Sequence, residues 1–296
     1  REPVKSYDIV IFGNFTKDTI ISSTGTRQVG GGGFNYGAQA AARTGLKVAA
    51  VTRLAQEDSS ILRDLEQAGI DVYPTFTPHS THMTLDYPNS NPDDRILTTP
   101  LTAGSYSVGQ FDDLEAKAYL INGSIRGETP ASVVEHLHQR SGLLVADAQG
   151  FIRVVSEDKT LVNLPWPEKE YILSMIDFLK VDIVEAESLT GEKDIFKAAK
   201  MIHEWGPSEV VLTHRDGILV YAEGKYYEAE FSPEELIGRS GRGDTCIASY
   251  TAKRLNASPA EAIIWSAAVT SLKMEAEGPY KGSFEDIQTK IANSYQ

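Results

Sequence analysis

Short apolar runs alternate with amphipathic segments along most of the chain. Asp8 to Phe12 and Val48 to Thr52 are apolar runs, which predicts two strands buried on both faces. Between them, Asn35 to Thr44 is rich in alanine and stops at a glycine, which predicts a helix with a glycine C-cap. An amphipathic helix over 59–68 and a third strand over 70–73 continue the series. This order is typical of a parallel sheet covered by helices.

The alternation stops between residues 75 and 104, where threonine, proline, asparagine and aspartate prevail. Thr81 to Tyr87 and Arg95 to Thr99 are β-prone, so we expect a small antiparallel excursion from the main sheet. A similar segment, Thr19 to Gln28, precedes a run of glycines. We expect the two pieces to pair into one small β lid, formed by residues 14–34 and 75–104.

The strand and helix alternation resumes after Phe111. Ser258, followed by a proline and then a glutamate at the third helical position, predicts the start of a long helix into Met274. No repeat, low-complexity tract or linker interrupts the chain, so we expect residues 1–296 to form one domain. The further strands that we expect are Ala118 to Asn122, Leu143 to Ala146, Phe178 to Val181, Val210 to Thr213 and Ile218 to Ala222.

The amino-acid composition and net charge narrow the classes of partner and the compartment that we expect. The net charge of −13 disfavours nucleic acid and anionic membrane surfaces. No run of about 18 apolar residues predicts a membrane span, and the polar N-terminus lacks a signal-peptide core. Cys246 is the only cysteine, which excludes an intrachain disulfide and favours a reducing, cytoplasmic compartment. We interpret Cys246 as a small packing residue rather than a nucleophile.

The segment from Gly238 to Cys246 carries the most chemistry. Gly241 and Gly243 let consecutive backbone N–H groups face one point at what reads as a helix start, and such an arrangement suits a phosphate or another anion. We call Gly241, Arg242 and Gly243 the anion turn. Asp244 follows it, although a carboxylate is repelled by a bound phosphate. The economical explanation is that Asp244 accepts a proton from a hydroxyl that attacks the phosphate.

Three further motifs have both a functional and a structural interpretation. The glycines from Gly30 to Gly33, with Asn35 after them, allow close approach of a ligand, or they form a hinge. A dinucleotide fingerprint is rejected because the first strand ends well upstream, at Gly13. Asp18 binds hydroxyls or is a solvated loop carboxylate. Two acidic residues three apart, Asp182 and Glu185, hold Mg²⁺ through its waters or simply begin a helix. No P-loop sequence is present.

The order of these motifs resembles the ribokinase-like, or PfkB, family of carbohydrate and nucleoside kinases over nearly the whole chain. Gly241 to Asp244 falls on the end of the family motif Asp-Thr-x-Gly-Ala-Gly-Asp, and Gly30 to Asn35 falls on the motif Gly-Gly-x-x-x-Asn. The resemblance implies a three-layer α/β fold, with a mostly parallel sheet, helices on both faces and a small β lid. It also implies an ATP-dependent phosphotransferase acting on a hydroxyl of a sugar, polyol or nucleoside.

The resemblance assigns roles by position. Asp244 is the implied catalytic base, and the anion turn is the implied hole for the transferring phosphoryl group. ATP is the implied donor and Mg²⁺ the implied metal, a monovalent cation is a further candidate cofactor, and the lid is a candidate homodimer interface. The remaining implied residues bind substrate (Thr16, Asp18, Gly31, Asn35), nucleotide (Thr213, Gly217, Ala267) and metal (Asp182, Glu185).

Departures from the family pattern leave alternatives open. Gly238 stands where the late motif begins with aspartate, and Arg242 stands where it has alanine, so Arg242 either reaches a phosphate or points to solvent. The segment from Asp147 to Arg153 resembles branches of the family that include inositol kinases, or it is a structural Asp–Arg pair. The sequence leaves open the donor and the substrate, which we expect Thr81, Met83 and Tyr87 to select. A non-catalytic ligand-binding or regulatory protein on the same fold is the alternative function.

Overall fold

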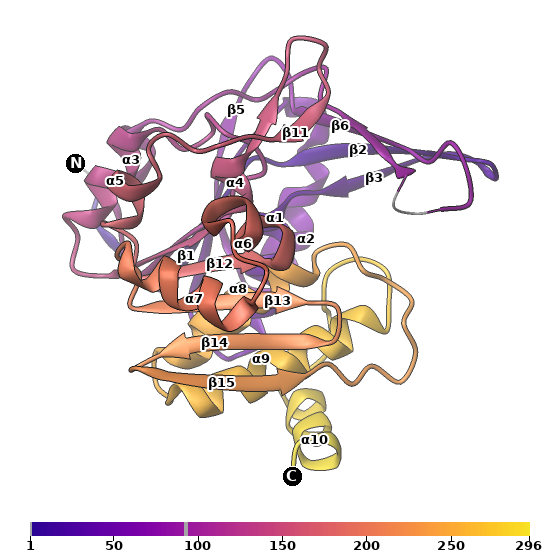
Figure 1. Ribbon diagram of the computed structural model, residues 1–296. Coiled ribbons are helices and arrows are strands. Elements are labelled where there is room, and N and C mark those ends of the chain that lie inside the picture. Colours follow the sequence, from indigo (N-terminus) through magenta and orange to yellow (C-terminus); the bar gives the residue numbers. More distant parts are fainter. Residues whose placement is uncertain (1, 92–93) are drawn as a thin grey trace.

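A nine-stranded sheet forms the centre of the molecule (Figure 1). The computed structural model describes residues 2–91 and 94–296. Seven neighbouring strands of this sheet pair in parallel, and the two strands at one edge are antiparallel. In spatial order the strands are β15 (Lys225–Glu230), β14 (Gly217–Ala222), β13 (Glu209–His214), β12 (Phe178–Asp182), β9 (Leu143–Asp147), β8 (Leu114–Ile121), β1 (Lys5–Phe12), β4 (Val48–Leu54) and β5 (Asp71–Phe76).

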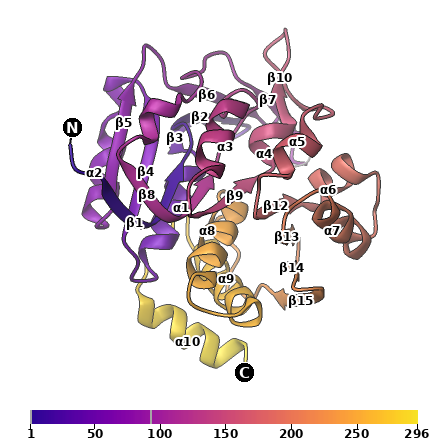
Figure 2. The ribbon, with the colours of Figure 1, turned by 90° about the vertical axis from the view of Figure 1, so that its left-hand side faces the viewer.

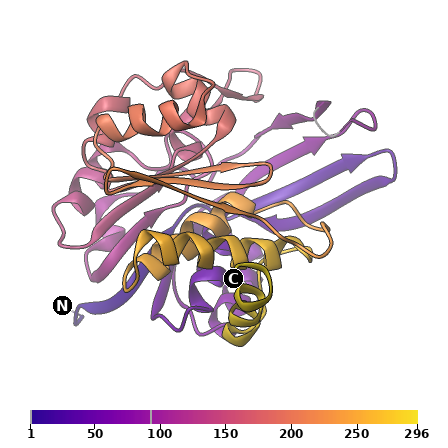
Figure 3. The same ribbon diagram turned by 60° about the horizontal axis from the view of Figure 1, so that its bottom comes forward.

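Helices cover both faces of this sheet, which Figure 3 shows as one helical layer above it and another below it. Each layer has its own apolar core against the sheet. Figure 2 shows α8 and α9 packed together, with α10 beyond them. One layer holds α1 (Gly33–Ala42), α2 (Ser60–Gln67), α8 (Arg242–Arg254), α9 (Pro259–Met274) and α10 (Phe284–Ser294). The other holds α3 (Ala131–His138), α4 (Gln149–Ile152), α5 (Lys169–Leu173), α6 (Ile183–Thr190) and α7 (Ile195–Glu204).

The predicted three-layer α/β fold with a mostly parallel sheet is confirmed. The capping box predicted at Ser258 opens α9, since its side chain accepts from the backbone N–H of Glu261. Strand β15 is missing from the sequence prediction because its outer positions are exposed and polar, so it lacks an apolar run.

Short 3₁₀ turns, η1 (Gln56–Asp58) and η3 (Val108–Phe111), and a hairpin of β10 (Arg153–Val155) and β11 (Leu161–Asn163) complete the elements. None of the helices in the described ranges has the length and apolar character needed to cross a membrane.

A second, four-stranded sheet projects beyond the main sheet on the right of Figure 1. Its order is β3 (Gly25–Gly31), β2 (Thr16–Ser22), β6 (Thr81–Asp86) and β7 (Ile96–Thr98), so the two segments expected to pair do pair. The antiparallel excursion expected within 75–104 is confirmed, because β6 and β7 pair antiparallel, whereas the two segments join through parallel pairing of β2 with β6. Strand β2 follows β1 along the chain, and β6 follows β5. Because β1 and β5 are parallel, β2 and β6 leave the main sheet at the same carboxyl end and keep one direction. We call this sheet the lid; residues 92 and 93 of the expected segment 75–104 lie outside the described residues.

Candidate active site

The candidate site lies where the carboxyl ends of the central strands meet the first turns of α1 and α8. Gly241 is the N-cap of α8 with a left-handed φ of 78°, and Asp244 lies in the first turn of that helix. The N–H of Arg242 donates to the carbonyl of Arg239 at 3.2 Å. The N–H groups of Gly241 and Gly243 have no backbone acceptor among the described residues. The anion turn therefore offers two free donors at a helix N-terminus, where an anion is stabilised.

Three glycines allow the site to assemble at close range. A β-carbon on Gly33, the first residue of α1, would lie 2.6 Å from Oδ1 of Asp244 and would overlap the side chain of Asn122. A β-carbon on Gly241 would overlap the ring of Tyr36, and one on Gly243 would lie 2.6 Å from Nζ of Lys180. The anion turn thus packs between α1 and β12 with no room for a side chain at Gly241 or at Gly243. The glycines expected to admit a ligand also admit neighbouring protein groups.

Asp244 has the electrostatic properties of a proton acceptor. Burial, followed by repulsion from Asp147, raises the pKa of Asp244 to about 6, while Lys180 and Arg153 oppose the shift. The side chain is not fully covered, because Asp244 is only half-buried. A carboxyl group with a pKa near 6 is ionised at neutral pH and is a stronger base than an ordinary aspartate. The environment therefore suits transfer of a proton from a substrate.

Lys180 lies under the anion turn on β12 and was not identified from the sequence. Its ammonium lies 3.5 Å from Oδ2 of Asp147 and 3.8 Å from Oε1 of Glu185, and only 4% of the residue is exposed. Burial alone would lower the pKa of Lys180, but Asp147 and Glu185 raise it above its usual value. Lys180 is therefore charged and contributes positive potential directly behind Gly243. A single lysine within an apolar strand was the available sequence signal.

Arg153 is the second cation that enters the site. It interacts electrostatically with Glu185, Asp147 and Asp244, and burial lowers its pKa. Of the two interpretations left open for this segment, the structural Asp–Arg pair is wrong, because Asp147 pairs with Lys180 instead. Among the described residues no carboxylate lies within ion-pair distance of the Arg153 guanidinium. Arg153 is thus available to a bound anion.

The predicted hydroxyl-binding residues surround a group of unpartnered polar atoms. Asp18 lies on β2, and a β-carbon on Gly31 would lie 3.1 Å from both Asp18 Oδ2 and Thr16 Oγ1. Burial raises the pKa of Asp18 to about 6, against a hydrogen bond from Thr16. Oδ1 of Asp18, Oδ1 of Asn35 and both amide atoms of Asn122 are buried without a protein partner. Buried polar atoms are normally satisfied, so these atoms are suited to the hydroxyl groups of a ligand.

The three expected specificity residues differ in position. Met83 is the register partner of Asp18 on β6 and packs with Ile125 and Leu161, which gives the site an apolar wall. Thr81 is fully buried, and its hydroxyl accepts from the backbone of Ala103, so its role is structural. Tyr87 follows the end of β6 and lines a hollow beneath the tip of the β2–β3 hairpin. Of the three, Met83 lies beside Asp18.

The predicted metal residues form a capping box. Oδ1 of Asp182 accepts from the N–H of Glu185 at 2.7 Å, and Oε1 of Glu185 accepts from the N–H of Asp182 at 2.9 Å. Burial raises the pKa of Glu185 to about 7. Within the described ranges, no three acidic, histidine or cysteine side chains gather as a metal site. The pair can hold Mg²⁺ only through water and through the phosphates of a ligand, which is the usual way Mg²⁺ binds.

The residues predicted to contact nucleotide are covered by protein. Thr213 is 1% exposed at the end of β13, and Gly217 begins β14 against the backbone of Ala229. Ala267 is fully buried in α9, within the core below the sheet. Across the β13–β14 turn Thr213 pairs with Ile218 and Gly217 pairs with His214, and none of the three predicted residues presents a side chain to an open cleft.

The remaining residues of the late motif divide between site and core. Arg242 lies at the first position of α8, with its guanidinium 5.7 Å from the ring centre of Phe231, and burial lowers its pKa. Cys246 is fully buried, and burial raises the pKa of its thiol to about 11. The interpretation of Cys246 as a packing residue follows, because a thiol with that pKa stays protonated at neutral pH.

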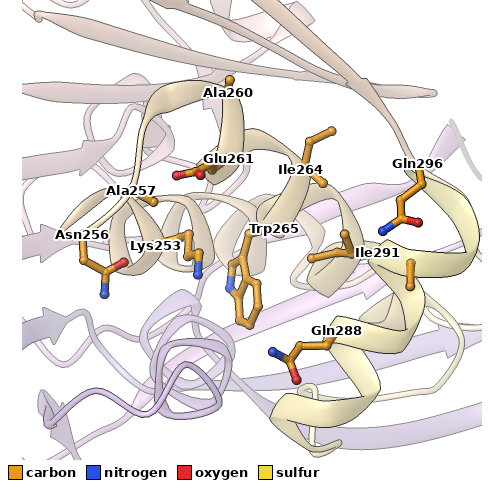
Figure 4. A pocket seen from close by; sticks show the side chains of 11 residues that line it. Lys253, Asn256, Ala257, Ala260, Glu261, Ile264, Trp265, Gln288, Ile291 and Gln296 are labelled. Atoms are coloured by element: carbon orange, nitrogen blue, oxygen red, sulfur yellow. The ribbon is translucent and has the colours of Figure 1, made fainter.

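A separate hollow of about 680 Å³ lies between the α8–α9 turn and α10 (Figure 4). Lys253, Trp265 and Ile291 are among the residues that line it, and its lining includes none of the site residues described above. It is mostly apolar and offers one carboxylate, Glu261, which caps α9. The site around Asp244 is therefore better suited to proton transfer than this hollow.

Comparison with known proteins shows which family and fold the chain resembles. Residues 5–286 match the family model of the pfkB family carbohydrate kinases. A cytidine kinase of Thermococcus kodakarensis is 26% identical over 278 residues, which cover 86% of this chain and 91% of the relative. A solved pyrophosphate-dependent kinase in the ribokinase family, complexed with a pyrophosphate analog and myo-inositol, is 32% identical with a TM-score of 0.87, covering 95% and 99% of the two chains. Arabidopsis thaliana ribokinase, complexed with ribose and ATP, shares the fold at a TM-score of 0.78 and 17% identity over 97% and 99%.

Proposed function

The chain belongs to the pfkB family of carbohydrate kinases, and we propose that it is a sugar, polyol or nucleoside kinase in which Asp244 is the general base. One observation carries the proposal. The half-buried Asp244, with a pKa raised to about 6, follows directly on the free donors of the anion turn, and its carboxylate meets Gly33 at the start of α1, two residues before Asn35. Burial, and then the charges of Asp244 and Asp18, raise the pKa of Tyr36, so both carboxylates lie near the same ring. An anion site and a hydroxyl site therefore meet at one proton acceptor, as transfer of a phosphoryl group to a hydroxyl requires.

The acceptor is held at the lid side of the site. Asp18 and Asn35 take its hydroxyl groups, with Thr16 and the backbone of Gly31 beside them. Asp244 accepts the proton of one hydroxyl as that oxygen forms a bond to the phosphorus of the donor. The bond between this phosphorus and the bridging oxygen breaks, and its electron pair leaves with the remainder of the donor.

The phosphoryl group is held at the opposite side of Asp244. The N–H groups of Gly241 and Gly243 point to its oxygens, and the charged Lys180 lies behind Gly243. Arg153 and the Arg242 guanidinium add positive charge where negative charge is transferred. Mg²⁺, when bound, neutralises phosphate charge, and Glu185 is the residue placed to hold its waters.

ATP with Mg²⁺ is the donor that the family resemblance implies, with Thr213, Gly217 and Ala267 near the nucleotide. Pyrophosphate is a second candidate, and two observations favour it. The three nucleotide residues are covered by protein, whereas Lys180, Arg153 and Arg242 gather around the anion turn, and pyrophosphate needs phosphate contacts without a base site. In addition, the relative with 32% identity is a pyrophosphate-dependent kinase crystallised with myo-inositol. A cyclic polyol is therefore the first acceptor to test.

Two further features support proposals about the assembly and its compartment. The lid presents the exposed apolar side chains Val29 and Ile96, which are 37% and 50% exposed, and these support a homodimer formed through the lid. The free thiol of Cys246 supports a reducing, cytoplasmic location. A non-catalytic binding protein on this fold is the contrasting function, and an unused proton acceptor between two binding sites argues against it.

The test is a donor-by-acceptor matrix. Purified protein is incubated with Mg²⁺ and either ATP or pyrophosphate, each with myo-inositol, ribose or cytidine, and the phosphorylated acceptor is measured directly by mass spectrometry. We expect product formation with at least one pair, and pyrophosphate with myo-inositol is the leading pair. Turnover with ATP alone would assign the nucleotide donor. Absence of product throughout, with acceptor binding detected by calorimetry, would support the binding protein instead.

A further inference from the structure

The loop that leads into the anion turn is fixed to the end of α9. The N–H groups of Ile237 and Gly238 both donate to the carbonyl of Met274, at 2.9 and 3.0 Å. A β-carbon on Gly238 would overlap the carbonyl of Ala276. The loop and the chain after α9 are therefore in backbone contact. This explains why glycine replaces the aspartate expected at the start of the motif, because no side chain fits there.

Lys273 lies inside this contact. It is 1% exposed, and its ammonium donates to the carbonyls of Gly238 and Ala276 at 3.3 and 3.4 Å. The ammonium also lies 5.5 Å from the ring centre of Tyr36, and that same ring fills the space above Gly241. Within the described ranges no carboxylate lies within ion-pair distance of Lys273. A buried cation is thus surrounded by carbonyl oxygens and a π face.

This environment is chemically that of a bound monovalent cation. Backbone carbonyls and aromatic faces are ligands of K⁺ and ammonium ions, and they satisfy a cation without neutralising it. Burial lowers the pKa of Lys273, and Glu277 and Asp244 oppose that shift. A separate K⁺ or ammonium ion at these carbonyls would find the space already filled by the Lys273 side chain, and the charge of that side chain would repel it. The residues present therefore do not fit the separate monovalent cation considered from the sequence.

We infer that Lys273 is a built-in monovalent cation that positions the anion turn, so that the protein needs no K⁺ or ammonium for activity. Lys273 is a positioning residue: it acts through the Gly238 carbonyl and the Tyr36 ring on Gly241, and it does not touch the reacting atoms. The inference rests on the proposed function of the anion turn. A purely structural lysine at a helix end would stabilise α9 in the same place, so the test must separate the two.

The experiment exploits chemical rescue. Lys273→Ala removes the ammonium and leaves a space for an ion, whereas Lys273→Met removes the charge and keeps the space filled. Turnover is measured for each variant at constant ionic strength, with tetramethylammonium chloride replaced stepwise by ammonium or potassium chloride. We expect wild type to be indifferent to the ion. We expect Lys273→Ala to lose about 10- to 100-fold in kcat, as misplacement of catalytic groups does, and to regain much of it with a saturable dependence on ammonium or K⁺. Lys273→Met should show no rescue.

Lys290 supplies the matched control, because its ammonium is also largely buried and donates to a backbone carbonyl, that of Ser232. Lys290→Ala should show no ion-dependent change in kcat. The melting temperature of Lys273→Ala, which requires no substrate, should rise with ammonium more than that of wild type. Asp244→Asn combined with Lys273→Ala should keep this thermal response, so failure of the proposed chemistry is distinguished from failure of the inference. Stimulation of wild type by K⁺, or a Lys273→Ala variant that responds to no ion, would overturn it.

Discussion

Gly33→Ala tests the packing of α1 against the proposed base. Gly33 is a helical residue without a positive φ, so alanine meets no backbone strain there. Its β-carbon would lie 2.6 Å from Oδ1 of Asp244, whereas an ordinary contact begins at 3.4 Å. The carboxylate or the helix must therefore move by about 0.8 Å. The added methyl group also overlaps the Asn122 side chain, so movement toward that side is blocked.

A displacement of this size is large for a proton acceptor. A misplacement of about 1 Å can cost 10²-fold in rate, so we expect kcat to fall about 10- to 100-fold. Overpacking costs about 1–3 kcal/mol of stability, partly offset by the better helix propensity of alanine, which is worth up to about 1 kcal/mol. The assay is steady-state turnover with the active donor and acceptor, together with thermal unfolding of the same preparation.

Gly109→Ala is the control, because the nearest atom to its β-carbon is 3.9 Å away and its φ is not positive. That variant should match wild type in turnover and in melting temperature. Unchanged kcat in a folded Gly33→Ala protein would refute the reasoning. Such a result would mean that the position of Asp244 against α1 does not limit the reaction.

The other predictions concern charge. Lys180→Met should cost about 3–5 kcal/mol of unfolding free energy, since it leaves buried Asp147 and Glu185 unpaired; Asp147→Asn added to it should recover part of the loss in urea unfolding, and strictly additive effects would contradict the pairing. The rate kcat/KM should fall below about pH 6, because the raised pKa of Asp244 means that the base is protonated there; Asp18 titrates in the same range, so Asp18→Asn must keep the acid limb, and its loss would assign the limb to Asp18. Cys246→Ser should leave kcat within a few-fold of wild type, since the buried thiol has no chemical role; a large loss would contradict this.

Much of the fold was predictable because buried parallel strands carry their own signal. The apolar runs at β1, β4 and β12 predict strands without reference to neighbours, and the glycine and Ser258 signals mark helix ends. The direction of β2 against β6 was not predictable. Parallel pairing there depends on both strands leaving the main sheet at the carboxyl end of its parallel strands, which is a property of the whole topology.

The site was predictable where one segment carries the geometry. Gly241 to Asp244 is contiguous, so the turn and the carboxylate could be placed together from the sequence. Lys180 and Asn122 could not be placed, because each is one polar residue, within β12 or just after β8, that only the fold brings to the site. Lys273 gave no sequence signal at all, since a lysine in the last turn of a helix is ordinary. Its burial under Gly238 is visible only in three dimensions.

Asp244→Asn tests the central claim most directly, because it removes the proton acceptor and keeps the shape. Acceptor and donor binding are measured by calorimetry, turnover by direct detection of phosphorylated product, and stability by thermal unfolding. We predict binding within a few-fold of wild type and a melting temperature at neutral pH that does not fall, since the raised pKa of Asp244 means that its charge opposes folding there. Turnover should drop by about 10²- to 10⁴-fold. Near-normal turnover in this variant would contradict the assignment of Asp244 as the general base.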